Sequence, residues 1–165
     1  MVCYLQLVIC SSSNAYPGGQ PRLSRGWLFV LETVIISSMY YFYIFIFGGF
    51  LGWILDTAFR SLQDKRYSPG TLIPFFSIIY GAGAVVLDVL FVYAPLAAYL
   101  QVLVGAVLVV LLELLSGLIA LAVLKRRLWN YETSRFNYRG FIDLQHSLYW
   151  LLLIAAYRAA YQFFR

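Results

Sequence analysis

Four long apolar stretches constrain the fold of this sequence more than any other feature. They cover about residues 40–59, 74–93, 96–124 and 144–164. A helix of about 20 apolar residues crosses a hydrocarbon layer of roughly 30 Å, because each residue adds about 1.5 Å to its length. The sequence therefore predicts an all-α membrane protein, in which a bundle of four transmembrane helices forms one domain over residues 39–165.

Charged residues and prolines mark the ends of these spans. A cluster of charges between Asp56 and Arg66 closes the first span, and Pro74 occupies a favourable first-turn position in the second. The dipeptide Ala94-Pro95 ends the second span, because proline lacks the backbone N–H that would continue the helix. The basic run Lys125-Arg126-Arg127 ends the third span.

The composition excludes the soluble alternatives. Hydrophobic residues make up 62% of the chain and charged residues 12%, whereas a soluble domain has about 45–50% and about 25%. A soluble domain of this size also leaves about a third of its unfolded-chain surface in water. A soluble enzyme, a nucleic-acid-binding domain and a disordered chain are therefore excluded, so the lipid bilayer is an expected partner and nucleic acid is not.

The basic residues of the loops predict the orientation of the helices. The loop of residues 60–73 carries three basic residues, the loop of residues 125–143 carries five, and the turn between the second and third spans carries none. Short loops rich in lysine and arginine stay in the cytoplasm. We therefore expect a multi-pass protein of the cell (inner) membrane with both basic loops inside and the N-terminal side and C-terminus outside.

The first 38 residues do not continue this pattern. The turn-forming segment of residues 11–19 separates a short apolar start from the remainder of the chain. We expect residues 1–38 to be poorly ordered or a spurious extension, with Met39 as the start of the protein. An interfacial helix over residues 27–38 that runs into the first span is the alternative, and a signal peptide fits less well because no basic residue precedes the apolar start.

Two ionisable residues lie deep inside predicted spans. Asp88 follows Pro74 by 14 residues and Arg158 follows Leu144 by 14 residues, so both lie about 21 Å above the cytoplasmic side. A lone charge within a span costs about 2.5–3.5 kcal/mol on insertion scales. The equal depth predicts a structural ion pair between Asp88 and Arg158, and a charge that lines a substrate path is the alternative.

A second polar layer is expected at the cytoplasmic ends of the helices. Asp56 and Arg60 share a helix face at i and i+4, and Glu113 reaches the same level on the third span. We expect these residues to form a polar vestibule or partner site with two others, Arg139 and His146. Asp143 is well placed to cap the fourth helix. A purely structural layer is the alternative.

The sequence contains no signature of catalysis or of a bound metal. The carboxylates and the single histidine lack the spacing of metal ligands, so neither a metal nor a cofactor is predicted. A Walker glycine loop and a GxSxG motif are both absent. The chain is therefore not expected to be an enzyme, and any ATP would be hydrolysed by a separate ATPase chain. The GxxxG spacing of Gly48 and Gly52 predicts close helix packing instead.

Several motifs follow one another along the chain. The first two are the segments of residues 49–56, ending in Gly-Trp-x-x-acid, and 79–84, reading Ile-Tyr-Gly-Ala-Gly-Ala. The motif residues of the loop and the following helix are Trp129, Tyr131, Phe136, Asn137, Gly140, Ser147 and Trp150. In this order the motifs resemble one family, the bacterial "putative ABC-transporter type IV" permease-like membrane proteins. Glu113 is similar in type and spacing to the third-helix glutamate of that family. The chain departs from the family pattern at Asn130, where aspartate is usual, and at Leu121, which replaces an acid.

The resemblance, over about residues 40–155, implies a permease-like subunit of a small-solute transport system. Such a subunit would assemble as a homo-oligomer or with other membrane subunits, because four helices enclose little space. The aromatic and basic loop between the third and fourth helices also fits a non-transporting adaptor that binds lipid or a soluble partner. An intramembrane enzyme acting on lipid is the third hypothesis, although no nucleophile and base pair is evident.

Overall fold

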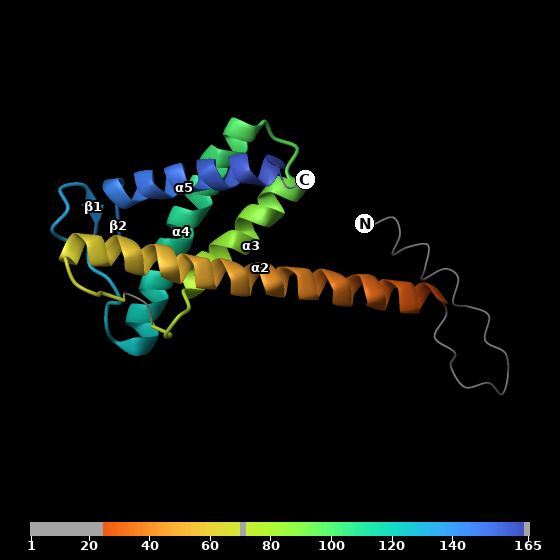
Figure 1. Cartoon of the computed structure of the whole chain (residues 1–165), viewed down its shortest axis with the longest axis horizontal. Coiled ribbons are helices and arrows are strands. Elements are labelled where there is room, and N and C mark those ends of the chain that lie inside the picture. Colours follow the sequence, from red (N-terminus) through yellow and green to blue (C-terminus); the bar gives the residue numbers. More distant parts are fainter. Residues whose placement is uncertain (1–24, 70–71, 164–165) are drawn as a thin grey trace. The chain divides into compact units, whose positions relative to one another are not determined.

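A computed structural model describes residues 25–69 and 72–163, which form helices and one short β-hairpin (Figure 1). The elements, in chain order, are α2 (Arg25–Asp64), α3 (Ile78–Tyr93), α4 (Ala98–Leu124), β1 (Asn137–Tyr138), β2 (Ile142–Asp143) and α5 (Leu144–Phe163). The chain is mostly helical, as predicted. The antiparallel pairing of β1 with β2 was not predicted, because strands of two residues leave no periodic pattern in a sequence.

The chain divides into two units, Met1–Phe42 and Tyr43–Arg165. In the first unit the described part is helical from Arg25 onward, as the first portion of α2. Residues 25–38 are helical, and both the poorly ordered segment over residues 1–38 and the alternative of an interfacial helix over residues 27–38 stay predictions. Residues 1–24, which carry the remainder of the predicted poorly ordered segment, lie outside the described residues.

The helix ends agree with the charge and proline signals, with one exception. Helix α4 ends at Leu124, and Lys125 takes a left-handed φ of 56° as its C-cap. Helix α3 ends at Tyr93, before the predicted Ala94-Pro95 break. It begins only at Ile78 rather than at Pro74, because Phe75 has a φ of 63° that no helix can accommodate.

Two of the described helices are long and apolar enough to cross a membrane. They are the segment Phe29–Asp64 of α2 and the whole of α4, whereas α3 is apolar but shorter. The apolar side chains of α4 mostly face outward, since Val107 is 60% exposed and Ile119 is 61% exposed. A core helix of a soluble protein would bury them. These helices point to a membrane protein. That four helices cross the membrane stays a prediction.

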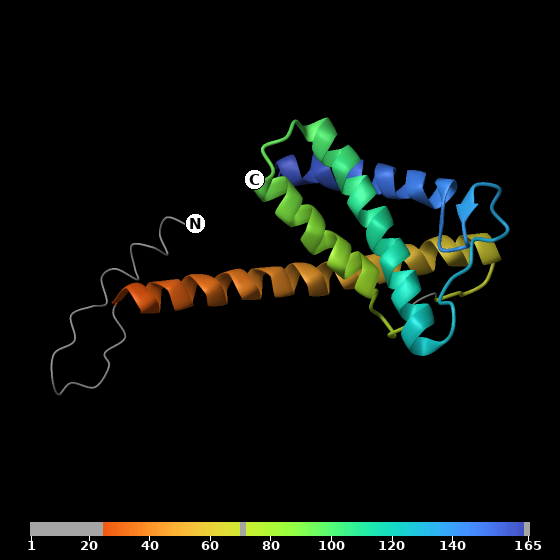
Figure 2. The ribbon, with the colours of Figure 1, turned by 180° about the vertical axis from the view of Figure 1, so that it is seen from behind.

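Within the second unit, α3, α4 and α5 pack around a small apolar core (Figure 2). The core consists of Leu87 and Phe91 from α3, Val109 from α4 and Ile154 from α5. Because each of the three helices contributes to it, this core fixes the helices relative to one another. It lies in the half of the bundle near the α3–α4 connection.

Close contact between α2 and α3 depends on glycine, as the GxxxG spacing predicts. A Cβ atom on Gly48 would lie 2.6 Å from the Cβ of Ala84, and one on Gly52 would overlap the Cβ of Tyr80. The backbone N–H of Ser77 donates to the carbonyl oxygen of Gly49 at 2.9 Å. The prediction of close helix approach at these glycines is therefore confirmed.

Candidate functional site

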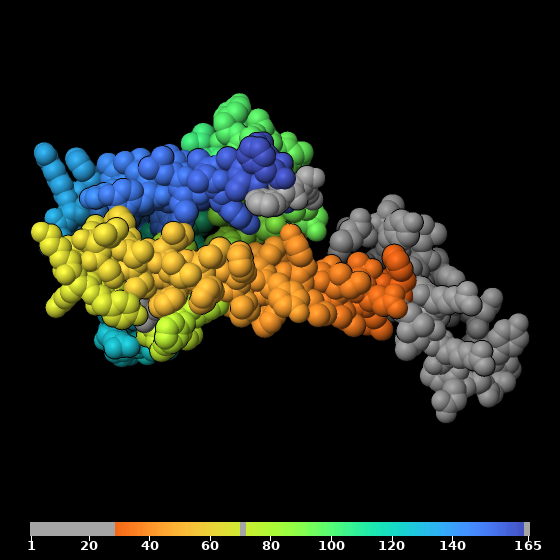
Figure 3. All heavy atoms as spheres, viewed as in Figure 1, coloured from red at the N-terminus to blue at the C-terminus, as the bar shows by residue number. Residues whose placement is uncertain are grey.

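A pocket of about 1690 Å³ lies in the second unit. In the space-filling view it corresponds to the hollow between the later part of α2 and the start of α5 (Figure 3). The start of α3, the later half of α4 and the loop before β1 complete its lining. Four of the five predicted vestibule residues line this one pocket, namely Asp56, Arg60, Glu113 and His146.

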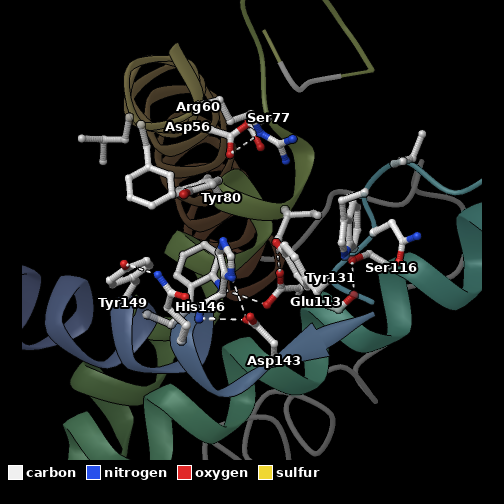
Figure 4. A pocket seen from close by; sticks show the side chains of 18 of the residues that line it. Asp56, Arg60, Ser77, Tyr80, Glu113, Ser116, Tyr131, Asp143, His146 and Tyr149 are labelled. Carbon is white, nitrogen blue, oxygen red and sulfur yellow. Dashed lines mark hydrogen bonds and ion pairs between the residues drawn. The ribbon is translucent and has the colours of Figure 1, made fainter. Parts of the chain in front are cut away.

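Glu113 is a buried acidic group of the pocket, with 5% of its surface exposed. The hydroxyl of Tyr131 donates to its Oε1 at 3.0 Å (Figure 4). The indole Nε1 of Trp150 donates to its Oε2 at 2.9 Å. Tyr131 belongs to the loop after α4 and Trp150 to α5. One carboxylate of α4 therefore holds two other segments of the chain in place.

Asp56 and Arg60 form an ion pair along α2, on the side of the pocket that also carries Ser77 and Tyr80 (Figure 4). The Nε of Arg60 lies 3.1 Å from each carboxylate oxygen of Asp56. Both side chains are partly exposed. The predicted i, i+4 pairing is confirmed, and the pair is neutral as a whole.

His146 and Asp143 form the opposite side of the pocket, at the start of α5. Asp143 Oδ1 accepts the backbone N–H of His146 at 2.9 Å, so the predicted cap of this helix is confirmed. The same oxygen lies 2.6 Å from His146 Nδ1. Burial opposes ionisation of Asp143, but hydrogen bonds from His146 and Ser134 outweigh it and lower the pKa of this carboxyl.

The imidazole of His146 stacks on the ring of Tyr131, with 4.1 Å between the ring centres and an interplanar angle of 20°. This contact holds the tyrosine hydroxyl toward Glu113. Burial, and after it the negative charge of Glu113, raises the pKa of Tyr131 above its usual value. Tyr131 therefore keeps its proton and remains a hydrogen-bond donor at physiological pH.

The loop motif residues form a hairpin that positions Tyr131. Gly140 has a φ of 73°, and its N–H donates to Asn137 Oδ1 at 2.9 Å. Its carbonyl accepts the N–H of Tyr131 at 3.0 Å. Trp129 Nε1 donates to the carbonyl of Phe141 at 2.9 Å. These residues therefore serve to shape the local backbone turn. Gly140 itself does not line the pocket.

The remaining motif residues have peripheral or local positions. Ser147 Oγ donates to the carbonyl of Asp143 at 2.7 Å, which supports the first turn of α5. The side chain of Phe136 lies at the edge of the pocket and is 63% exposed. Arg139, predicted as a vestibule residue, is exposed on the hairpin with its guanidinium 5.7 Å from the ring centre of Tyr138. It does not line the pocket.

Asp88 and Arg158 lie in the other half of the bundle, next to the apolar core. Asp88 is 1% exposed on α3. Arg158 on α5 donates from Nε to Gln101 Oε1 at 2.7 Å, and its guanidinium lies 5.4 Å from the ring centre of Phe91. Gln101 in turn donates to the carbonyl of Ala94 at 3.0 Å. The Asp88–Arg158 pair itself stays a prediction.

We expect Asp88→Ala and Arg158→Ala each to lower the free energy of unfolding by on the order of 3 kcal/mol, because each would leave the other charge of the predicted pair without compensation. The double variant should recover part of the loss, as measured by unfolding in detergent. A double-mutant cycle of Gln101→Ala and Arg158→Ala is the control, since a hydrogen bond of 2.7 Å joins these two side chains. Additive losses for Asp88 and Arg158 alone would show that these two residues do not interact.

Two residues of the molecule were missed by the sequence reasoning. Gln101 satisfies carbonyl groups at the end of α3, and a single polar residue inside an apolar span could have revealed it. Tyr80 packs against Trp150 with 4.7 Å between ring centres. The motif of residues 79–84 contains Tyr80, but the sequence analysis assigned this tyrosine no role in the pocket.

Comparison with known proteins identifies the family of this chain. No curated protein and no solved structure matches it. A family model described as "Putative ABC-transporter type IV" matches residues 43–164. The match begins at the residue where the second structural unit begins, so it covers that unit almost completely. The chain belongs to the putative ABC-transporter type IV family.

Proposed function

We propose that this chain is a permease-like subunit of a membrane transport system for a small solute, acting together with other subunits. Family membership favours a transport-related role in general. The observation that carries the narrower proposal is Glu113, a buried carboxylate that faces a pocket among apolar helices. A carboxylate in such surroundings is costly. Because Glu113 lines the pocket, its position favours a role in binding solute over a purely structural role.

The proposal requires assembly, because the few helices of a single chain enclose little space. A second copy of the chain or other membrane subunits would complete the path. The described residues include no nucleotide-binding loop of the Walker type, so a separate ATPase chain would supply energy.

Purification of the tagged chain from its native membrane, followed by reconstitution in liposomes, tests this proposal. We expect further membrane subunits or an ATPase chain to co-purify in fixed stoichiometry, and the reconstituted assembly to take up solute in an ATP-dependent way. A chain that purifies alone, or with a soluble protein only, and gives no uptake would contradict it.

The same proposal places both basic loops in the cytoplasm. Single cysteines at Lys65 and Arg135, in a background with Cys3 and Cys10 replaced by serine, should resist a membrane-impermeant reagent in intact cells. Leu96, in the turn between α3 and α4, is the matched position on the other side and should be labelled. Efficient external labelling at residue 65 or 135 would overturn the topology.

A membrane adaptor is the second candidate function, and the β1–β2 hairpin favours it. Arg135 lies over the ring of Phe136 at 5.5 Å, and Arg139 lies over the ring of Tyr138 at 5.7 Å. Both rings are more than half exposed. Exposed aromatic and arginine pairs suit contact with lipid headgroups or a soluble protein. An adaptor would lose its partner when the hairpin arginines are replaced, whereas a permease would lose uptake when the pocket is altered.

A further inference from the structure

The pocket has a wall of aromatic rings contributed by three segments of the chain. Phe59 on α2 lies 5.2 Å from Tyr149 on α5, measured between ring centres. The ring of His146 is 5.7 Å from Tyr149 and 4.1 Å from Tyr131 of the loop. All four side chains line the pocket. Their mutual contacts make one continuous aromatic surface in the pocket that Glu113 also lines. Figure 4 labels three of these residues, Tyr131, His146 and Tyr149, together with Glu113.

The charges of the pocket are not balanced. Its lining contains the carboxylates Asp56, Asp64, Glu113 and Asp143 and the guanidinium groups of Arg60 and Arg135, together with the imidazole of His146. Arg60 offsets Asp56, and the ring of His146 contacts Asp143. In contrast, the two described groups that hydrogen-bond to Glu113 are a phenol and an indole, which carry no formal charge. A cation in the pocket would therefore supply the opposite charge that these two donors to the Glu113 carboxylate lack.

We propose that this pocket binds an organic ammonium cation, held between the Glu113 carboxylate and the aromatic wall of Phe59, Tyr131, His146 and Tyr149. The faces of aromatic rings attract cations through their quadrupole, and the attraction grows when the cation loses its water. A carboxylate in the same pocket adds a full negative charge. This inference rests on the proposed function and names the class of solute.

Two other classes of ligand fit the pocket less well. An anion would face Glu113, while the Nε of Arg60 is already directed to Asp56. A metal ion would need several ligands at close range, and the described residues contain no group of three or more potential ligands of this kind. The ammonium group itself could come from a free solute or from a phospholipid headgroup, since both present the same chemistry.

Titration calorimetry on the full chain in phosphatidylglycerol nanodiscs, with three probes of one shape, tests the inference. The probes are choline, its uncharged isostere 3,3-dimethylbutan-1-ol and the anion 3,3-dimethylbutanoate. We expect choline to bind at least about tenfold more tightly than either of the others, which corresponds to about 1.4 kcal/mol. Equal binding of the uncharged alcohol, or binding of none of the three, would overturn the inference.

Two variants probe the two halves of the site. Glu113→Gln removes the charge and should weaken choline binding about tenfold or more. Phe59→Leu keeps an apolar side chain but removes one aromatic face, and should weaken it about threefold. Glu132→Gln and Tyr138→Leu are the matched controls, because Glu132 of the loop and Tyr138 of β1 both lie outside the pocket lining. If the controls weaken binding as much as the pocket variants, the site assignment is wrong.

A further arm separates the two sources of the ammonium group. Nanodiscs that contain an equal share of phosphatidylcholine should compete with choline if a lipid headgroup is the natural occupant, and should leave choline binding unchanged if a free solute is. The experiments test the class of solute and the permease role separately. Uptake without choline binding would reject the ammonium cation as the ligand and support the permease role. Choline binding without uptake would support the ammonium cation as the ligand and reject the permease role.

Discussion

The variant Glu113→Gln should remain inserted and folded but lose nearly all solute uptake by the assembled system. Glutamine has the size of glutamate but offers a single acceptor oxygen, so the hydroxyl of Tyr131 or the indole of Trp150 loses its partner. The unsatisfied donor costs about 1–3 kcal/mol of stability. If Glu113 contacts solute, uptake per folded molecule falls much further than stability does.

Uptake and the amount of folded protein are therefore measured on the same membranes. Glu132→Gln serves as the control, because it also removes one carboxylate but from an exposed position of the loop. Uptake that falls only in proportion to the folded protein would assign Glu113 a structural role. Full stability together with full uptake would exclude both roles.

The variant Gly52→Ala should destabilise the second unit by on the order of 2–3 kcal/mol, because the added Cβ would overlap the side chain of Tyr80. The overlap involves the Cβ of Tyr80, which no rotation of the tyrosine side chain can move. The two helices would have to separate. Thermal unfolding in detergent measures the effect.

Gly83→Ala makes the same change at a site where it fits. A Cβ atom there would have its nearest neighbour, Val109 Cγ2, at 3.9 Å, which is an ordinary contact. Because alanine favours a helix over glycine by about 1 kcal/mol, this variant should be neutral or slightly more stable. Equal losses in both variants would mean that glycine is required for a reason other than close approach.

The sequence predicted the helices well where physical signals are strong. The Ala94-Pro95 break and the basic run after Leu124 coincide with helix ends in the structure. The start of α3 was misplaced because proline permits a helix but does not require one. The helix starts later because Phe75 has a left-handed backbone, and its ring packs against Trp53 of α2 with 4.9 Å between ring centres. This contact between separate segments leaves no local signal in the sequence.

The site was predicted in part, for a similar reason. Depth and charge alone brought Asp56, Arg60, Glu113 and His146 to one level, and all four line the pocket. The same reasoning failed to exclude Arg139, because the direction of a side chain on a hairpin depends on turn geometry. The roles of Tyr131 and Trp150 depend on contacts across 18 and 37 residues, which helix periodicity does not report.

The hydrogen bond from the Ser77 N–H to the Gly49 carbonyl has a consequence for movement between α2 and α3. The first N–H groups of a helix have no hydrogen-bond acceptor within the helix, and in apolar surroundings no water is present to accept from them. Here the neighbouring helix supplies the acceptor. Sliding α3 by one turn along α2 would break this bond and force Tyr80 past Gly52. The two helices therefore form a pair with a fixed register, and a change in the shape of the pocket would have to come from α4, α5 or the loop between them.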